Sequence, residues 1–136
     1  MQPPEKLKYE VARQWLQSAE EDLGVAQHLL SAKVPYSRAI GFHAQQAAEK
    51  FLKAYLTWNQ KEFPKTHNLG NLLDLVAEIN PPLADALRGA SQLNPYAVET
   101  RYPSEGPRVS IGEAKQAMEL AAKVRKRILE ALKQEP

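Results

Sequence analysis

The residue types best suited to proton transfer at a phosphate lie close together, between positions 38 and 53. Arg38 and His43 are separated by four residues in this segment. Imidazole titrates near neutral pH and can move a proton, while a guanidinium can stabilise negative charge on a phosphate. His43 shares a helix face with Ile40 and Ala47, so it is either a hydrogen-bonded structural group on the core side or a general acid–base residue.

Helix geometry does not stack Arg38 on His43. Five residues at 100° each place the two side chains about 140° apart around the helix axis. A shared site therefore requires Arg38 to reach around the start of the helix, or a second subunit to bring the two groups together.

Three more charged residues follow on the same predicted helix. Glu49 and Lys53 are four positions apart, the spacing of an ion pair on a solvated helix face. Lys50 and Lys53 can also contribute to a patch that attracts phosphate. We therefore treat Glu49 as a solvated residue and the two lysines as candidate nucleotide- or RNA-binding residues.

A second histidine, His67, follows Thr66, whose hydroxyl is suited to cap a third helix. We interpret His67 as an exposed first-turn residue, where the helix N-terminus disfavours an imidazolium and favours an anion. No second and third ligand stand at metal spacing beside it, and the chain has no Gly-rich phosphate loop. The sequence therefore predicts neither a metal site nor a cofactor.

A stretch rich in proline, residues 94–107, shows no helical period and predicts an ordered loop. Tyr96 and Tyr102 either cover the ends of apolar helices or offer a ring on which a base can stack. Arg101 is the candidate phosphate-binding residue of this loop, because its planar guanidinium matches the geometry of phosphate oxygens.

Apolar residues three and four positions apart predict the helices that must position these groups. The predicted buried stripe of the second helix is Ile40, Ala44, Ala47, Ala48, Phe51, Leu52 and Tyr55. The predicted buried stripe of the last helix is Ile111, Ala114, Met118, Ala121, Ala122, Val124, Ile128, Leu129 and Leu132. The expected helices cover residues 5–33, 36–60, about 66–79, 83–93 and about 110–133. Pro35 and Pro64 end the first two, and Ser110 with Glu113 forms a capping box for the last. Three long and two shorter helices with brief links indicate antiparallel neighbours in a bundle.

Composition limits the class of protein. The 136 residues predict a single domain, 1–136, with its core at about 5–133, and 43% apolar with 25% charged residues is typical of a soluble domain. The absence of cysteine excludes disulfides, a thiolate zinc site and a cysteine nucleophile, and fits the cytoplasm. No apolar stretch is long enough to cross a membrane. A net charge of +2 requires any nucleic-acid contact to rest on a local patch.

Three blocks of sequence carry a family resemblance: FHAQQAAEKFLKAYL at 42–56, KTHNLGNLL at 65–73 and YAVETRYP at 96–103. In order and spacing the chain resembles the HEPN family (higher eukaryotes and prokaryotes nucleotide-binding domain), over about residues 5–133. The resemblance implies an all-α, up-and-down antiparallel four-helix bundle with one additional short helix. It also implies a homodimer or higher homo-oligomer, and a toxin–antitoxin-like pair with a separately encoded minimal nucleotidyltransferase.

The resemblance also implies a catalytic motif. Many HEPN proteins are metal-independent RNases with an Arg, four to six residues and then a His, and sites from two subunits meet at the dimer cleft. Arg38 and His43 match this spacing, but Ala39 stands where active members usually carry Asn, Asp or His. Nucleotide binding would rest on His43, Lys50, Arg101 and Tyr102.

Three functions are therefore open. The favoured one is a HEPN protein that binds nucleotide or RNA and acts as an oligomer with the nucleotidyltransferase. The second is an endoribonuclease toxin, in which His43 moves the proton as a 2′-hydroxyl attacks the adjacent phosphate and Arg38 stabilises the phosphorane. The third is a non-catalytic interaction module whose polar residues are structural.

Overall fold

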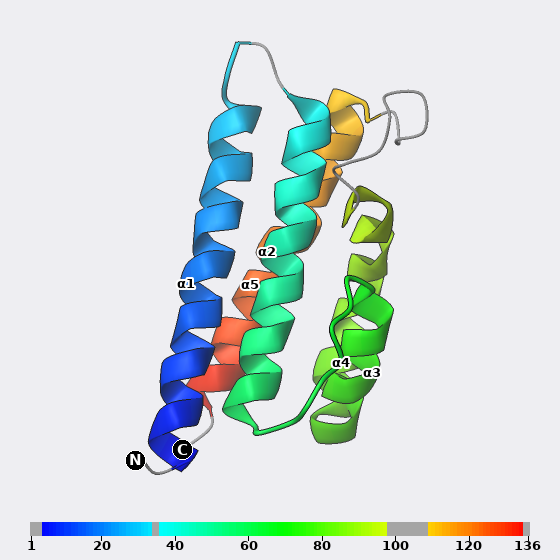
Figure 1. Cartoon of the computed structure of the whole chain (residues 1–136). Helices are drawn as coiled ribbons and strands as arrows, with labels where there is room; N and C mark the ends of the chain where they lie inside the picture. The colour runs from blue at the N-terminus through cyan, green and yellow to red at the C-terminus, as the bar shows by residue number, and fades with distance from the viewer. Residues whose placement is uncertain (1–3, 34–35, 98–108, 135–136) are drawn as a thin grey trace.

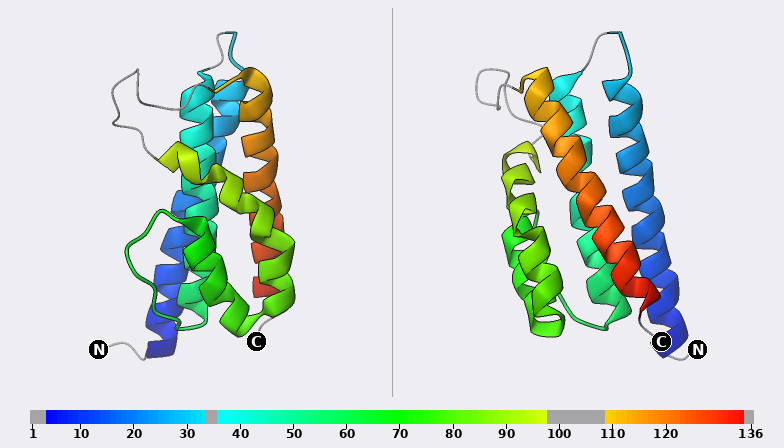
Figure 2. Two further views of the ribbon diagram at one scale, coloured as in Figure 1. Left: turned by 90° about the vertical axis from the view of Figure 1, so that its right-hand side faces the viewer. Right: turned by 180° about the vertical axis from the view of Figure 1, so that it is seen from behind.

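The fold is built from helices alone in the computed structural model, which describes residues 4–33, 36–97 and 109–134. In chain order they are α1 (Pro4–Leu30), α2 (Ser37–Trp58), α3 (Leu69–Ile79), α4 (Pro81–Leu87), the 3₁₀ helix η1 (Arg88–Ala97) and α5 (Ile111–Lys133). Helix α1 and the α4–η1 pair run one way, and α2 and α5 run the other way (Figures 1 and 2). The predicted all-α, up-and-down bundle is confirmed, and α3 is its additional short helix.

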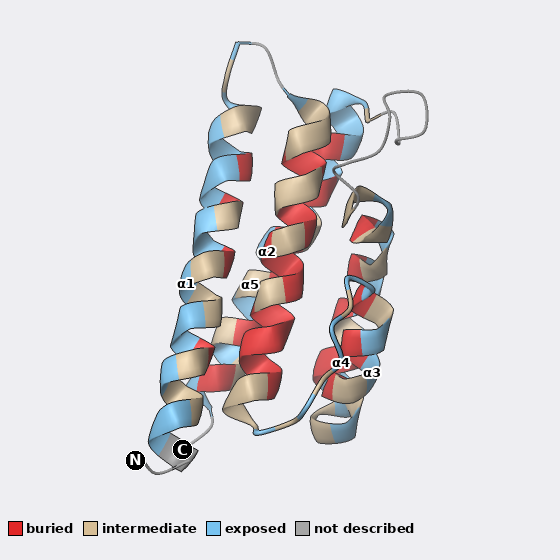
Figure 3. Cartoon of the chain, viewed as in Figure 1, coloured by how far each residue is buried: buried red, intermediate tan, exposed pale blue. Residues whose placement is uncertain are grey.

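Helix α2 is the centre of the bundle, because it packs against α1, α5, α3 and η1 (Figure 1). Its predicted apolar stripe is confirmed, and all seven of its residues are buried: Ile40, Ala44, Ala47, Ala48, Phe51, Leu52 and Tyr55. Figure 3 shows this burial along the length of α2. The alanines matter because small side chains at a contact let the axes of neighbouring helices approach. The helix that carries the candidate residues is therefore held in place by contacts with four neighbouring elements.

The last helix, α5, begins as predicted. The Ser110 side chain accepts a hydrogen bond from the Glu113 backbone, and the Glu113 side chain accepts one from the Ser110 backbone. Two residues predicted for its buried side, Ile111 and Ala122, are exposed instead. Ala117 takes a buried position that the stripe omitted. Of the other predicted residues, Leu129 is half-buried and the rest are buried.

The third helix begins at Leu69, three residues after the predicted cap at Thr66. Asn68 is the cap, and its side-chain oxygen accepts from the backbone N–H groups of Gly70 and Asn71. The Thr66 hydroxyl instead accepts from the backbone N–H of Asn68, which closes a turn before the helix. The prediction identified a residue able to cap but not the point where the chain turns into a helix.

The fourth helix begins earlier and the helical path ends later than predicted. Pro81 and Pro82 open α4, where a missing N–H costs nothing, and the Asn80 side chain accepts from the backbone N–H of Leu83. The chain continues as η1 to Ala97, so residues 94–97, predicted as loop, are helical. The rest of that predicted loop, residues 98–107, lies outside the described residues.

The close approach of Gly41 on α2 to Tyr96 in η1 provides a test of how these two helices pack. A Cβ added at Gly41 would lie 3.0 Å from Cγ of the Tyr96 ring and 3.1 Å from its Cδ1. Gly41→Ala should therefore lower the free energy of unfolding by about 1 kcal/mol, because overpacking outweighs the better helix propensity of alanine. Urea denaturation of both proteins measures the difference.

Gly24 on α1 is the matched control, because a Cβ there meets nothing within 4 Å. Gly24→Ala should raise the free energy of unfolding by about 0.5–1 kcal/mol. In a Tyr96→Ala background, Gly41→Ala should also become stabilising. Equal stabilisation by both alanines in the unmodified chain would contradict the proposed clash.

Candidate functional site

His43 is held by a carboxylate from the neighbouring helix. Its Nδ1 lies 2.8 Å from Oδ1 of Asp22 on α1, and the other oxygen of Asp22 lies 2.6 Å from Nζ of Lys50. An ionised carboxylate can only accept, so Nδ1 carries a proton, and in the neutral ring Nε2 is left as an acceptor. The His43 side chain is 27% exposed. It lies at the edge of the core, where both interpretations, structural group and acid–base residue, apply.

Arg38 lies in the first turn of α2 and is partly buried. Its Nη2 is buried and has no hydrogen-bond partner among the residues that the structure describes. The cap residue, Tyr36, contributes no side-chain hydrogen bond to this helix start. Because buried donors are nearly always satisfied, Arg38 has unused capacity to bind an anion. The structure joins His43 and Lys50 through the carboxylate of Asp22, and leaves Arg38 about 140° away from His43 around α2.

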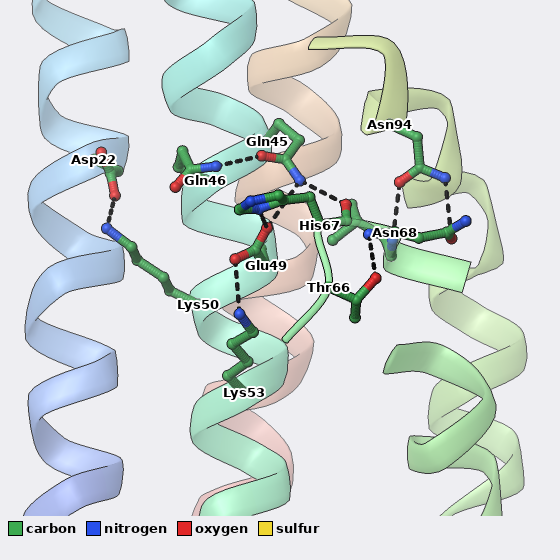
Figure 4. A network of polar contacts seen from close by, with 11 residues as sticks. Asp22, Gln45, Gln46, Glu49, Lys50, Lys53, Thr66, His67, Asn68 and Asn94 are labelled. Carbon is green, nitrogen blue, oxygen red and sulfur yellow. Dashed lines mark hydrogen bonds and ion pairs between the residues drawn. The ribbon is translucent and has the colours of Figure 1, made fainter. Parts of the chain in front are cut away.

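The expectation that Glu49 lies on a solvated face is wrong. Glu49 is 3% exposed and Lys53 is 8% exposed, although their predicted ion pair forms at 2.9 Å. The chain between α2 and α3 covers them, and the His67 carbonyl accepts from Nε2 of Gln45 at 3.0 Å (Figure 4). Helix spacing predicted the pair, but it could not reveal which segment covers it.

His67 is exposed, as predicted, with 67% of its side chain accessible. The contact that the sequence did not indicate is its Nδ1, which lies 2.8 Å from Oε1 of Glu49 (Figure 4). Gln45 donates to the same oxygen at 3.2 Å. The two partners are 18 residues apart, and no local spacing signals such a contact.

The lysines differ in how they can be reached. Nζ of Lys53 lies 5.4 Å from the Trp15 ring centroid and 5.7 Å from that of Phe63, in addition to its bond to Glu49. Its charge is thus already compensated inside the protein. Lys50 is 22% exposed and lies at the surface between α1 and α2. We retain Lys50 as a ligand-facing candidate, whereas binding by Lys53 stays an untested prediction that burial disfavours.

Two predicted site residues, Arg101 and Tyr102, lie outside the described residues and stay predictions. Tyr96 from the same predicted loop packs partly buried against the core. Burial raises the pKa of Tyr96, and the nearby carboxylate of Glu113 raises it further. Asn94 accepts from the backbone N–H of Leu69 at 2.8 Å, so this stretch helps to position the start of α3.

Within the ranges 4–33, 36–97 and 109–134, no group of three or more His, Cys, Asp or Glu side chains could hold a metal ion. Among those same residues, no helix is long and apolar enough to cross a membrane.

Almost the whole chain is similar to a known protein family and to a solved structure. A family model described as "HEPN domain" matches residues 12–132. The crystal structure of TT1696 from Thermus thermophilus is similar, with 32% sequence identity and a TM-score of 0.69. That match covers 88% of this chain and 96% of the other. No curated protein matches at a significant level.

The buried pair of Glu49 and Lys53 makes a prediction about stability. Lys53→Ala should lower the free energy of unfolding by about 3 kcal/mol, because it leaves an uncompensated buried carboxylate. Lys61→Ala is the control: Lys61 pairs with Glu78 at 3.1 Å on the surface, and the change should cost less than about 1 kcal/mol. Urea denaturation measures both, and similar losses would show that Glu49 is not buried as described.

Proposed function

The chain belongs to the HEPN domain family, and on this premise we propose that it binds nucleotide or RNA through the exposed side of α2. We call this surface the α2 polar face and define it by Arg38, Phe42, His43, Gln46 and Lys50, all partly buried. The observation that carries the proposal is the buried Nη2 of Arg38, a donor without a partner among the described residues. A guanidinium in a helix first turn suits a phosphate oxygen.

The face supplies local charge that the low net charge of the whole chain does not. Arg38 and Lys50 are both cationic, and Asp22 offsets only part of this charge through its contact with Lys50. Phe42 offers an apolar ring, packed edge-on against His43 with centroids 5.3 Å apart. Cations beside an aromatic ring are the components of a single-strand binding surface.

The same surface supports the proposed homodimer. Leu7 and Val25 on α1 are 52% and 38% exposed. At 100° and 1.5 Å per residue, Val25 lies within about 60° and about 5 Å of Asp22, which contacts His43 on α2, so an apolar side chain adjoins the α2 polar face. Leu7 lies about 22 Å further along α1. Pairing of two copies along this side of α1 would cover both apolar residues and bring two α2 helices together. We further propose that the dimer acts in the cytoplasm with a separately encoded minimal nucleotidyltransferase, as a toxin–antitoxin-like pair.

A metal-independent endoribonuclease is the second candidate, favoured by the bond between His43 and Asp22. In this reaction Nε2 of His43 takes the proton of a ribose 2′-hydroxyl, and that oxygen attacks the adjacent phosphorus. The bond to the 5′-oxygen breaks and this oxygen takes up the proton held by His43, which leaves a 2′,3′-cyclic phosphate and a 5′-hydroxyl end. Arg38 from the partner copy stabilises the phosphorane charge. Ala39 departs from the active pattern, so binding without cleavage is our first proposal.

Binding is tested with a short single-stranded RNA and, separately, with ATP, by fluorescence anisotropy and calorimetry. Arg38→Ala should weaken binding about tenfold or more, because it removes a charge-assisted hydrogen bond. Arg101→Ala should also weaken it. Arg13, exposed on α1, is the matched control, and Arg13→Ala should change little. No binding of either ligand would leave the interaction module as the better explanation.

Cleavage is tested with a structured RNA in the presence of EDTA. An active enzyme should produce fragments ending in a cyclic phosphate, and His43→Ala should abolish them. His28→Ala is the control, because His28 is exposed near the end of α1. Absence of cleavage, or cleavage that persists in His43→Ala, removes the second candidate and leaves the binding proposal standing.

A further inference from the structure

The atoms around Glu49 repeat the arrangement found around Asp22. Each carboxylate contacts an imidazole Nδ1 with one oxygen, at 2.8 Å in both cases: His43 for Asp22 and His67 for Glu49. Each contacts a lysine ammonium with its other oxygen, at 2.6 Å for Asp22 and 2.9 Å for Glu49. The structure therefore contains two imidazoles anchored in the same way, of which the proposed function uses only His43.

In the network around Glu49, the carboxylate and the imidazole differ sharply in how far they are buried. The carboxylate of Glu49 is almost completely buried, whereas the histidine that it binds is exposed. The His67 backbone is also fixed, because Gln45 donates to its carbonyl oxygen at 3.0 Å. A histidine that served only to neutralise Glu49 would duplicate Lys53, which already does so at 2.9 Å. The buried groups instead orient an imidazole that presents Nε2 to solvent.

The helix positions that hold the two imidazoles, His43 and Glu49, lie about 120° apart around α2. Gln46 falls between the helix positions of His43 and Glu49, and its amide donates to Oε1 of Gln45 at 2.7 Å. Figure 4 shows Gln46 between the pair formed by Asp22 and Lys50 and the ring of His67. Along the axis, positions 43 and 49 are about 9 Å apart. A continuous polar band therefore extends from the α2 polar face to His67.

We propose that His67 extends this site and selects RNA over DNA by accepting a hydrogen bond from a ribose 2′-hydroxyl. This inference rests on the proposed function. Glu49 accepts a hydrogen bond from Nδ1–H, so the neutral ring presents Nε2 as an acceptor. The 2′-hydroxyl is the donor that RNA has and DNA lacks. The N-terminus of α3 is not the contact, because Asn68 and Asn94 already occupy its first N–H groups.

Imidazole ¹H–¹⁵N spectra of the unmodified protein test this placement directly, because the chain has three histidines. His43 and His67 should both show the tautomer protonated at Nδ1. A single-stranded RNA should shift Nε2 of His43 and of His67, and leave His28 unchanged. A shift of His43 without one of His67 overturns the inference but not the proposed function. If the RNA does not bind at all, both fail.

Affinity for RNA and DNA of one sequence provides the second measurement. His67→Ala should weaken RNA binding about tenfold and leave the weaker DNA binding nearly unchanged, since only RNA offers the lost hydrogen bond. His28→Ala should change neither. Equal losses for both nucleic acids would indicate a merely structural role for His67 and overturn the inference, as would no loss for RNA.

Discussion

The burial of an ionised carboxylate is the constraint on which the rest of this structure depends. Glu49 lies on the central helix with 3% of its surface exposed, a position that is costly unless every lone pair is used. Lys53, Gln45 and His67 together satisfy it. Two of these partners come from α2 itself, but His67 comes from the connection to α3. The need to complete this network therefore fixes the path of the chain after α2, and with it the start of α3 at Leu69.

A second carboxylate performs the corresponding task where α2 faces α1. Asp22 reaches from α1 and contacts both His43 and Lys50, so the antiparallel packing of α1 determines how these side chains point. Without α1, the same residues would be ordinary polar groups on a helix surface. Chemistry-bearing residues are thus concentrated on one helix, while their orientation is supplied by elements on either side of it.

The hydrogen-bond networks around Glu49 and Asp22 connect the fold with nucleotide or RNA recognition. Membership of the HEPN domain family supports such a function. A chain with a net charge of +2 cannot rely on its overall field to attract a nucleic acid. It must hold a few donors and acceptors in fixed places. Nη2 of Arg38, which has no partner among the described residues, and the anchored imidazole rings are such groups. Rigid placement on a packed helix limits the entropy that binding would otherwise cost.

Features that depend on near neighbours in the chain could be predicted from the amino-acid sequence alone. The apolar stripe of α2, the capping box of Ser110 and Glu113, and the ion pair of Glu49 with Lys53 all follow from spacings of three and four residues. Only the tertiary structure decided that this pair is buried and that His43 and His67 bind carboxylates 21 and 18 residues away. It also decided that Asn68, not Thr66, caps α3. The reason is physical: burial and long-range hydrogen bonds depend on which segments pack together, and helix periodicity contains no record of that choice.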